Sequence, residues 1–199
     1  MEGASLNPMH ILITGARGFI GQALKPHLER QGHAVKTLSR QGDYTWGRLG
    51  QIPWEDFDAV IHLAGENIFG RWSASKKKRL MDSRVVLTES IAHNLARTKK
   101  RPKVFICASG IGIYGDTGKQ VVDEQACFGE TFLAQLAAQW ENACTAAKNA
   151  GVRTVPIRMG TVLSQKGGAL QKMLPLFKLG LGGTLGTGDQ LQSFVALED

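Results

Sequence analysis

The sequence predicts an α/β fold: a doubly wound, parallel β-sheet with helices on both of its faces. Short apolar runs alternate with longer helix-like segments along the chain, as in proteins whose parallel strands are joined by helices. The apolar runs are nearly continuous, which is typical of strands covered on both faces. With 199 residues, of which 43% are hydrophobic, the chain is long enough to form one domain with a sizeable core.

The individual elements follow from these patterns. We expect strands at residues 9–15, 33–40, 58–65, 103–110 and 153–163, and helices at 19–32, 73–99 and 131–149. Gly32 ends the first helix, and Pro26 is expected to bend it. A turn-rich loop occupies 114–130, and a Gly-rich tail with one short helix runs from 167 to 199. Residues 9–199 are predicted to form one domain, preceded by an extension or cloning remnant at residues 1–8.

The composition narrows the classes of function. No stretch approaches the ~20 apolar residues of a membrane helix, and the first residues lack the pattern of a signal peptide. Cys107, Cys127 and Cys144 form no C-x-x-C pair, so we expect buried or half-buried thiols, no metal site and a cytoplasmic location. The net charge is +7, with basic runs at 76–79 and 97–103. We interpret these runs as solvated surface rather than as a nucleic-acid or phosphate site.

The stretch "ITGARGFIG" places Gly15, Gly18 and Gly21 between the first predicted strand and the first predicted helix. Gly15 permits a tight turn, Gly18 lets a pyrophosphate approach the backbone, and Gly21 lets helix and strand pack closely. The N–H groups and the dipole at the start of the helix attract phosphates. The motif therefore predicts a Rossmann-type dinucleotide site; the alternative is a structural turn without a ligand.

The G-x-x-G-x-x-G spacing resembles that of the short-chain dehydrogenase/reductase superfamily, in its extended, sugar-epimerase-like branch. "HLAG" (62–65) and "ASGIGIYG" (108–115) resemble further motifs of that branch. From Met9 to about Gln192, the segments "HLAGEN", "RW", "SRV", "YGDTG", "RMGTVLSQKGGALQKMLPLFKLGLGG" and "GTGDQ" resemble the NAD(P)-dependent epimerase/dehydratase-like proteins of this superfamily. The resemblance implies a nicotinamide dinucleotide cofactor and hydride transfer.

The end of the second predicted strand bears on the choice of dinucleotide. An NAD site usually places Asp or Glu there, on the ribose 2′-hydroxyl. Here the strand ends in "TLSR", so Ser39 and Arg40 occupy the region. Arg40 can bind a 2′-phosphate, and Arg17 could add a second positive group. We therefore predict NADP rather than NAD; the alternative for Arg40 is a solvent-exposed charge at the strand end.

The acid catalyst of the superfamily is missing from its usual place. The resemblance implies a Tyr followed four residues later by a Lys, whose charge makes the Tyr more acidic. Tyr44 and Tyr114 are the two tyrosines, and neither has a Lys at that spacing. The helix at 131–149 instead carries an apolar stripe and is predicted to serve packing. Ser109, near the usual Ser position, and Tyr114 are our candidate catalytic residues, although Gly110 could occupy the Ser position instead.

Further polar groups follow the third predicted strand. Glu66 and Asn67 lie at its carboxyl end, where α/β sheets bind ligands, and Arg158 leaves the fifth strand toward the same edge. Arg84 would suit an anionic substrate or, alternatively, pair with Asp82 or Glu89 on the helix surface. The predicted cofactor site comprises Gly15, Arg17, Gly18, Phe19, Ile20, Gly21, Ser39, Arg40, Leu63, Ala64, Gly65, Glu66 and Arg84.

The resemblance also implies a C-terminal lobe after "GTGDQ". The final residues "SFVALED" correspond to "SWIHIDD" in the family pattern, and we expect the lobe to be absent. Apolar residues near Leu174, Leu176, Phe177 and Leu179 would then lose their cover and favour a homo-oligomer.

Two functions follow. One is an NADP-binding, oxidoreductase-like or epimerase-like protein acting by hydride transfer on a small carbonyl, hydroxyl or nucleotide-sugar-like substrate. The other is a catalytically silent NADP-binding sensor or scaffold.

Overall fold

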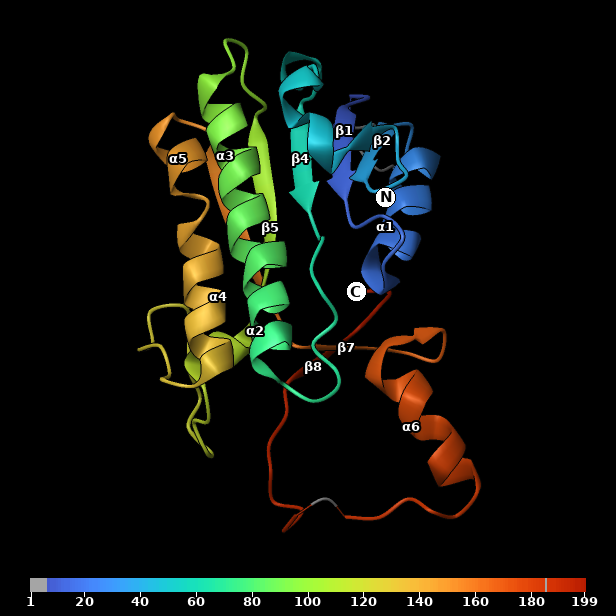
Figure 1. Ribbon diagram of the computed structural model, residues 1–199. Helices are drawn as coiled ribbons and strands as arrows, with labels where there is room; N and C mark the ends of the chain where they lie inside the picture. Colours follow the sequence, from blue (N-terminus) through green and yellow to red (C-terminus); the bar gives the residue numbers. More distant parts are fainter. Residues whose placement is uncertain (1–6, 185) are drawn as a thin grey trace. The chain divides into compact units, whose positions relative to one another are not determined.

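A computed structural model describes residues 7–184 and 186–199, and it confirms the predicted fold class. A six-stranded sheet has the order β3-β2-β1-β4-β5-β6 (Figure 1). β1 pairs in parallel with both β2 and β4, β2 with β3, and β4 with β5. The strands are β1 (His10–Thr14), β2 (Ala34–Ser39), β3 (Tyr44–Thr45), β4 (Ala59–His62), β5 (Val104–Gly110) and β6 (Arg153–Met159).

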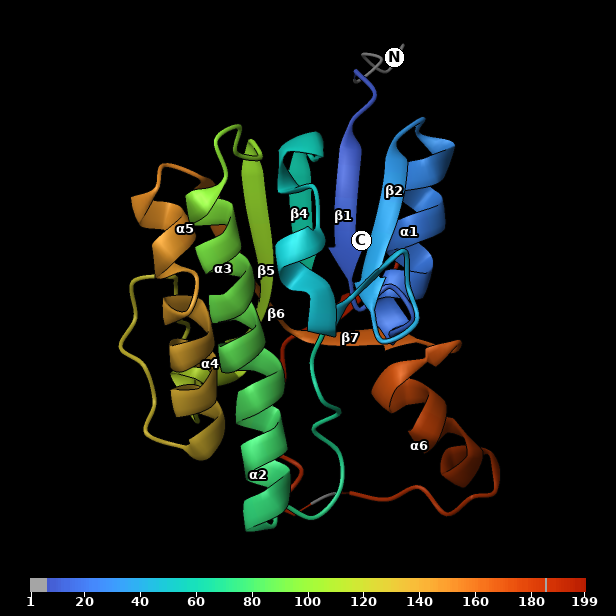
Figure 2. The same cartoon turned by 45° about the horizontal axis from the view of Figure 1, so that its top comes forward.

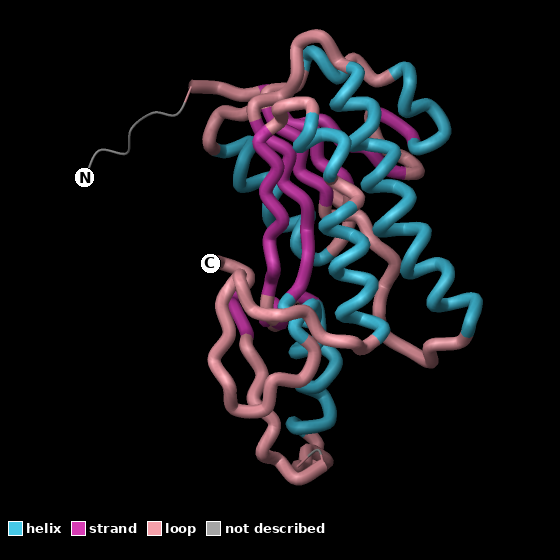
Figure 3. Tube along the Cα trace, turned by 90° about the vertical axis from the view of Figure 1, so that its left-hand side faces the viewer, coloured by secondary structure: helices cyan, strands magenta, loops and turns pink. Residues whose placement is uncertain are grey.

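Helices cover both faces of this sheet. α1 (Phe19–Arg30) lies behind β1 and β2, whereas α3 (Leu87–Arg97) lies in front of β4 and β5 (Figure 2). Figure 3 shows the strands in profile between the helical layers. The remaining helical segments are η1 (Trp46–Gln51), η2 (Trp54–Asp56), α2 (Ala74–Met81), η3 (Asp82–Val86), η4 (Ile111–Tyr114), α4 (Phe132–Asn142), α5 (Thr145–Asn149) and α6 (Gly168–Lys178).

The core forms because the central strands are apolar on both faces. Ile11 and Ile13 of β1 pack with Ala59 and Ile61 of β4, and partly buried residues such as Leu24 of α1 close this cluster. On α3, burial recurs at a spacing of three to four residues, at Thr88, Ile91, Ala92 and Leu95, which is the period of one helix face. The α/β alternation seen in the sequence therefore has a direct structural counterpart.

The chain divides into two compact units. The first comprises the described residues up to Ala108 together with Gln139–Ile157, and the second comprises Ser109–Ala138 and Arg158–Asp199. The first unit holds most of the six-stranded sheet. In the second, β7 (Thr161–Ser164) and β8 (Phe194–Ala196) form a two-stranded parallel sheet. Within the described parts of the chain, no helix is both long and apolar enough to cross a membrane.

The helices predicted at 73–99 and 131–149 are present, but each contains an irregularity that was not predicted. The helix expected at 73–99 contains a π-helical segment, η3, between α2 and α3, a device often found at functional sites. The helix expected at 131–149 ends as α4 and restarts as α5. The cause of this break is local, because the N–H of Cys144 bonds to the carbonyl of Glu141 three residues back, which tightens the turn.

The strand predictions also needed correction. The strand expected at 153–163 divides at Gly160, and its second half pairs with β8 in the separate sheet. The strand expected at 58–65 ends at His62, which leaves residues 63–65 free to form a loop. The expectation that the strands are covered on both faces was wrong for β2, where only Leu38 is buried. This strand is less covered because its outer neighbour, β3, is a short edge strand. Burial of all three thiols was also wrong, since Cys127 is exposed in its loop.

Candidate functional site

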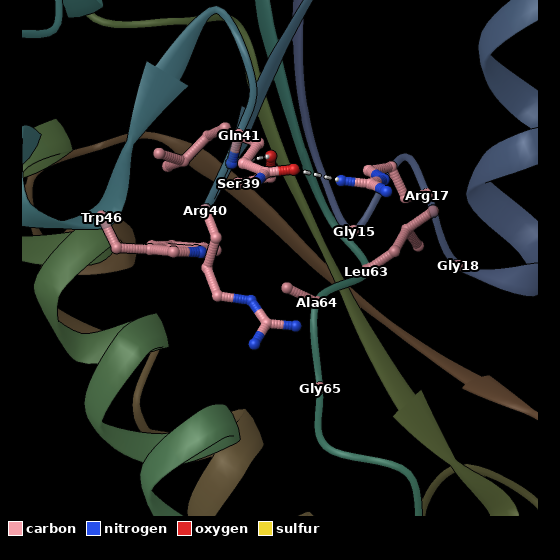
Figure 4. Close-up of a pocket in the computed structure, with 11 residues that line it drawn as sticks. Gly15, Arg17, Gly18, Ser39, Arg40, Gln41, Trp46, Leu63, Ala64 and Gly65 are labelled. Atoms are coloured by element: carbon pink, nitrogen blue, oxygen red, sulfur yellow. Dashed lines mark hydrogen bonds between the residues drawn. The ribbon is translucent and has the colours of Figure 1, made fainter.

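A cavity of about 630 Å³ opens where β1, β2 and β4 end. β1 lies between β2 and β4, so strand order reverses at this point, and open α/β sheets bind ligands at such switch points. Eight predicted cofactor residues line the cavity: Gly15, Arg17, Gly18, Ser39, Arg40, Leu63, Ala64 and Gly65. Leu38, Gln41 and Trp46 complete the lining (Figure 4).

Two glycines at the junction of β1 and α1 have no room for a side chain. Gly15 has φ +73°, and a Cβ there would lie 2.7 Å from the backbone nitrogen of Ala64. A Cβ on Gly21 would lie 2.3 Å from the carbonyl oxygen of Gly15. Backbone atoms cannot yield as side-chain ends do, so these positions require glycine. The loop is thereby drawn in close against both β4 and α1, as a backbone that cradles phosphates must be.

The start of α1 is open to an anion. Gly18 is the N-cap, no side chain caps the helix, and the first turn has no acidic residue. The N–H groups of a first helical turn have no partner within the helix and carry a positive dipole end. A phosphate group fits these donors. Phe19, Ile20 and Gly21 begin this helix but do not belong to the cavity lining.

A positively charged corner forms where β2 ends. The Arg17 guanidinium donates to Oε1 of Gln41 at 3.1 Å, and the N–H of Gln41 donates to the Ser39 hydroxyl at 3.1 Å. In Figure 4 the Arg40 guanidinium reaches into the space between the Trp46 ring and the Ala64–Gly65 backbone. Among the described residues, those that line the cavity include two arginines and no carboxylate. Such a corner suits a phosphate better than a free ribose hydroxyl.

Asp43 is the carboxylate nearest in sequence to this corner, and it is engaged elsewhere. It accepts hydrogen bonds of 2.8 Å from both the N–H and the hydroxyl of Thr37. Burial raises the pKa of Asp43, but the bonds from Thr37 and the charge of Lys36 outweigh it and lower the pKa overall. Asp43 therefore stays ionised and directed at Thr37, outside the cavity lining.

The wall opposite the glycine loop is fixed by Thr14. The N–H of Leu63 donates to the Thr14 carbonyl at 3.2 Å, and the N–H of Ala64 donates to the Thr14 hydroxyl at 3.1 Å. The same hydroxyl lies 2.6 Å from Nδ1 of His62. The two hydrogen bonds from the Leu63 and Ala64 N–H groups form because β4 ends at His62 and the chain then turns over the end of β1. The Leu63–Gly65 wall is therefore held by backbone geometry and by one buried hydroxyl.

His62 is buried between two indole rings. Its ring meets those of Trp46 and Trp140 edge-on, at centroid distances of 6.3 and 6.5 Å. Burial, together with the charge of Arg84, lowers the pKa of His62 from 6.5 to about 3. Within the described residues its Nε2 has no hydrogen-bond partner. The imidazole is therefore neutral at physiological pH and supports both the Thr14 hydroxyl and the Trp46 wall of the cavity.

Sequence reasoning did not identify three of the cavity residues. Gln41 follows β2 and Trp46 begins η1, in a segment whose sequence has no regular apolar pattern, and Leu38 was counted only as part of a strand. The available signal for Trp46 was its place a few residues after Ser39 and Arg40, at the end of β2. An aromatic residue at that distance can turn back over the strand end, but apolar patterning does not reveal it.

Glu66 and Arg84 lie beyond the cavity lining but contact it. The Glu66 N–H donates to the Ser83 hydroxyl at 2.9 Å, and Nη1 of Arg84 donates to the Glu66 carbonyl at 2.9 Å. The Glu66 carboxylate accepts from Nζ of Lys76 at 2.8 Å. The hydrogen bond from Lys76 lowers the pKa of Glu66, against a smaller opposing effect of burial. The alternative pairing of Arg84 with Asp82 or Glu89 was wrong, because the guanidinium turns inward to Glu66.

The basic run at 76–79 is mostly engaged in ion pairs. Lys76 is buried and bonded to Glu66, Lys78 pairs with Asp82 at 2.6 Å, and Arg79 lies 3.6 Å from Glu66. The interpretation as a wholly solvated face was therefore wrong for Lys76, whose side chain is only 11% exposed.

The candidate catalytic residues belong to the second unit. Ser109 is buried near the end of β5. The Tyr114 hydroxyl, at the end of η4, accepts a 2.8 Å hydrogen bond from Nη1 of Arg158. The same guanidinium stacks over the rings of Tyr114 and Phe128. Asn67, named as a further polar group, accepts from the Phe69 N–H. The catalytic roles of Ser109 and Tyr114 remain predictions.

The helix that lacks the Tyr and Lys is a packing helix, as predicted. Ala134, Leu136, Ala137 and Trp140 of α4 are buried. The indole N–H of Trp140 donates to the Thr88 hydroxyl at 2.9 Å. In the first unit, Cys107 and Cys144 are buried, and a hydrogen bond with Cys144 together with burial raises the pKa of Cys107.

Comparison with known proteins agrees with this geometry. The chain is 38% identical to the epimerase family protein YfhF of Bacillus subtilis over 96% of its own length and 67% of that relative. It is 40% identical to the epimerase family protein Mb2239 of Mycobacterium bovis, over 95% of this chain and 65% of the relative. The chain thus spans about two thirds of the length of these curated relatives.

Two solved structures are similar in both fold and sequence. The human epimerase family protein SDR39U1 (isoform 2), determined with NADPH, has a TM-score of 0.89 and 34% identity over 96% of this chain and 67% of that one. A nucleoside-diphosphate sugar epimerase from Corynebacterium glutamicum has a TM-score of 0.82 and 34% identity over 96% of this chain and 42% of that one. The family model for the NAD dependent epimerase/dehydratase family matches residues 11–199. With its glycine loop, its switch-point cavity and this match, the chain belongs to the NAD dependent epimerase/dehydratase family.

Proposed function

We propose that this chain binds NADP(H) in preference to NAD(H). The observation that carries the proposal is the cavity lining, where Arg17 and Arg40 accompany the glycine loop and where the structure describes no carboxylate. Two guanidinium groups attract a 2′-phosphate, whereas a carboxylate would repel it. The similar human protein was determined with NADPH, which supports the same choice.

The residues present fit such a ligand. The loop from Gly15 to Gly18 and the uncapped start of α1 would hold the pyrophosphate, and Ser39, Arg40 and Arg17 would hold the 2′-phosphate. The Leu63–Gly65 wall would close the other side. A nicotinamide bound in this cavity supplies or accepts hydride. We infer an oxidoreductase-like or epimerase-like reaction on a small carbonyl, hydroxyl or nucleotide-sugar-like substrate. We also infer a cytoplasmic location, which the free thiols of Cys107, Cys127 and Cys144 support.

A fluorescence titration with both reduced dinucleotides tests the proposal. We expect NADPH to bind more tightly than NADH, and Arg40→Ala to weaken NADPH binding about tenfold or more. The ratio of the two affinities should move toward one in this variant, because NADH lacks the phosphate that Arg40 would contact.

Arg48→Ala is the matched control, since Arg48 is an exposed arginine of η1 outside the cavity lining. It should leave the ratio unchanged. Tighter binding of NADH than of NADPH to the unaltered protein would contradict the proposal. So would a preference for NADPH that persists when both Arg17 and Arg40 are replaced by Ala.

A further inference from the structure

Three cationic side chains converge on the single residue Glu66. Nζ of Lys76 lies 2.8 Å and Nε of Arg79 lies 3.6 Å from the same carboxylate oxygen. Arg84 donates to the backbone carbonyl of Glu66 rather than to its carboxylate. The neighbouring Lys78 is balanced by Asp82. The Glu66 carboxylate therefore pairs with two of the three cations, which leaves an excess of positive charge beside the Leu63–Gly65 wall.

Of the three cations around Glu66, Arg84 is the one that forms no direct ion pair with a carboxylate of the described residues. Among residues 7–184 and 186–199, no carboxylate forms an ion pair with it, while Glu66 is engaged by Lys76 and Arg79. Its guanidinium lies 5.0 Å from the centroid of the Trp140 ring. A half-buried charge without a directly paired carboxylate is costly, and the more distant charge of Glu66 and the face of an indole ring offset only part of that cost. The site therefore favours an anion.

The guanidinium also lies directly against the cavity wall. A Cβ on Gly65 would be 3.1 Å from Cζ and 3.2 Å from Nη2 of Arg84, so the group packs on the backbone of a residue that lines the cavity. A guanidinium carries five N–H donors, and the bond to the Glu66 carbonyl uses one. The π-helical segment η3 supplies both Arg84 and Ser83, and it thereby sets the orientation of this group.

We propose that Arg84 binds an anionic group of the substrate, a carboxylate or a phosphate, beside the dinucleotide. The inference rests on the proposed function only in taking the cavity to be the dinucleotide site. It assigns the substrate to the class of anionic carbonyl or hydroxyl compounds. A planar guanidinium can bind either anion through two parallel hydrogen bonds, which a lysine cannot do.

Paired ligands test this assignment by calorimetry on the NADP⁺-saturated protein at constant, low ionic strength. Pyruvate is compared with methyl pyruvate, and dihydroxyacetone phosphate with dihydroxyacetone, so that carboxylate and phosphate are each matched to a neutral analogue. We expect at least one anion to bind about tenfold more tightly than its neutral partner. Arg84→Met should abolish that preference, and Arg84→Lys should restore it in part.

Lys78→Met is the matched control, because it removes a charge from the adjacent helix that Asp82 already balances. It should leave the preference intact. Equal binding of anion and neutral analogue, a preference that survives Arg84→Met, or a loss of preference in both Met variants would each overturn the inference. The same titrations without dinucleotide separate the two proposals. If NADP⁺ fails to bind while the Arg84-dependent preference persists, the proposed function fails and this inference stands.

Discussion

At the scale of single residues, the hydroxyl of Thr14 contacts both the cavity wall and the buried His62. It accepts from the Ala64 N–H at 3.1 Å and meets Nδ1 of His62 at 2.6 Å, and both Thr14 and His62 are fully buried. A hydroxyl that accepts from one neighbour can donate to another, which places the proton of a neutral His62 on Nε2. Two small, buried side chains thus determine how the chain leaves β4 toward the cavity.

His62 should make the protein sensitive to acid. The unfolded histidine titrates at 6.5, whereas burial lowers the pKa to about 3 in the folded chain. Between these values the unfolded state binds a proton that the folded state does not. The free energy of unfolding should therefore fall as the pH falls below 6.5, by up to about 1.4 kcal/mol per pH unit.

Urea unfolding of His62→Asn measured from pH 7 to pH 4 tests this expectation. Asn can keep a bond to Thr14 but does not titrate, so the slope of stability against pH should become shallower. His93→Asn, at an exposed position of α3, should preserve the slope of the unaltered protein. An unchanged slope in His62→Asn would show that other groups cause the acid sensitivity.

Gly21 should be intolerant of even the smallest side chain. Its substitution by Ala would place a Cβ 2.3 Å from the Gly15 carbonyl oxygen, so α1 must shift away from the loop. We expect a loss of about 1–3 kcal/mol in unfolding free energy and weaker dinucleotide binding. Gly47→Ala, where a Cβ would meet nothing within 4 Å, is the control. Thermal unfolding that is equal for the two variants would refute the steric argument.

At the scale of elements, the segment from Leu63 to Glu66 is an irregular loop that is hydrogen-bonded to the rest of the first unit at both of its ends. One end is bonded to Thr14 of β1, and the other end to Ser83 and Arg84 of η3. The side chain of Glu66 adds bonds to α2 through Lys76 and Arg79. Because the loop is fixed at both ends, the cavity wall is expected to exist before a ligand arrives, which reduces the ordering cost of binding.

Replacing Glu66 and replacing Lys76, each on its own, should lower the free energy of unfolding by unequal amounts. Glu66→Gln leaves Lys76, whose side chain is 11% exposed, without a counterion, whereas Lys76→Met leaves a more exposed Glu66 that still has Arg79. We expect a cost of about 1–3 kcal/mol for Glu66→Gln and a smaller one for Lys76→Met. The denaturant midpoints of both variants measure the difference. Lys78→Met, which removes the exposed ion pair with Asp82, is the control. The reverse order would contradict the burial argument.

Regular elements could be predicted from the sequence, but their interruptions could not. β1, β5 and α1 were predicted almost to the residue, since continuous apolar runs and Gly32 mark them. The division at Gly160 was missed because it depends on the distant Ser193, whose carbonyl oxygen would lie 2.9 Å from a Cβ on Gly160. The glycine loop and Arg40 of the cavity were predicted, but Trp46 was not, because its place depends on how the chain folds back after β2.

At the scale of the whole molecule, the second unit exposes several large apolar side chains. Leu179, Leu181 and Phe194 are each at least 70% exposed, and Leu176 and Phe177 are more than half exposed. Four of these residues fall within the short segment 176–181, and exposed apolar groups concentrated in this way are typical of interaction surfaces or sites of aggregation. We therefore infer that this unit associates with a second copy of the chain.

Light scattering over a series of protein concentrations tests this inference. Dimers or larger species should grow with concentration, and the double variant Leu179→Lys, Leu181→Lys should shift the distribution toward monomer. Val121→Lys replaces another exposed apolar residue of the same unit, 95% exposed, and should have little effect. A monomer at every concentration in the unaltered protein would rule the association out.

The position of Trp46 has an optical consequence. Its indole forms part of the cavity wall and meets His62 edge-on. Reduced nicotinamide absorbs in the range where tryptophan emits, whereas the oxidised form does not. A bound reduced dinucleotide should therefore collect excitation energy from this ring and emit it at longer wavelength, and Trp46→Phe should weaken that transfer. The protein thus carries its own internal reporter, by which the redox state of whatever fills the cavity can be followed without a label.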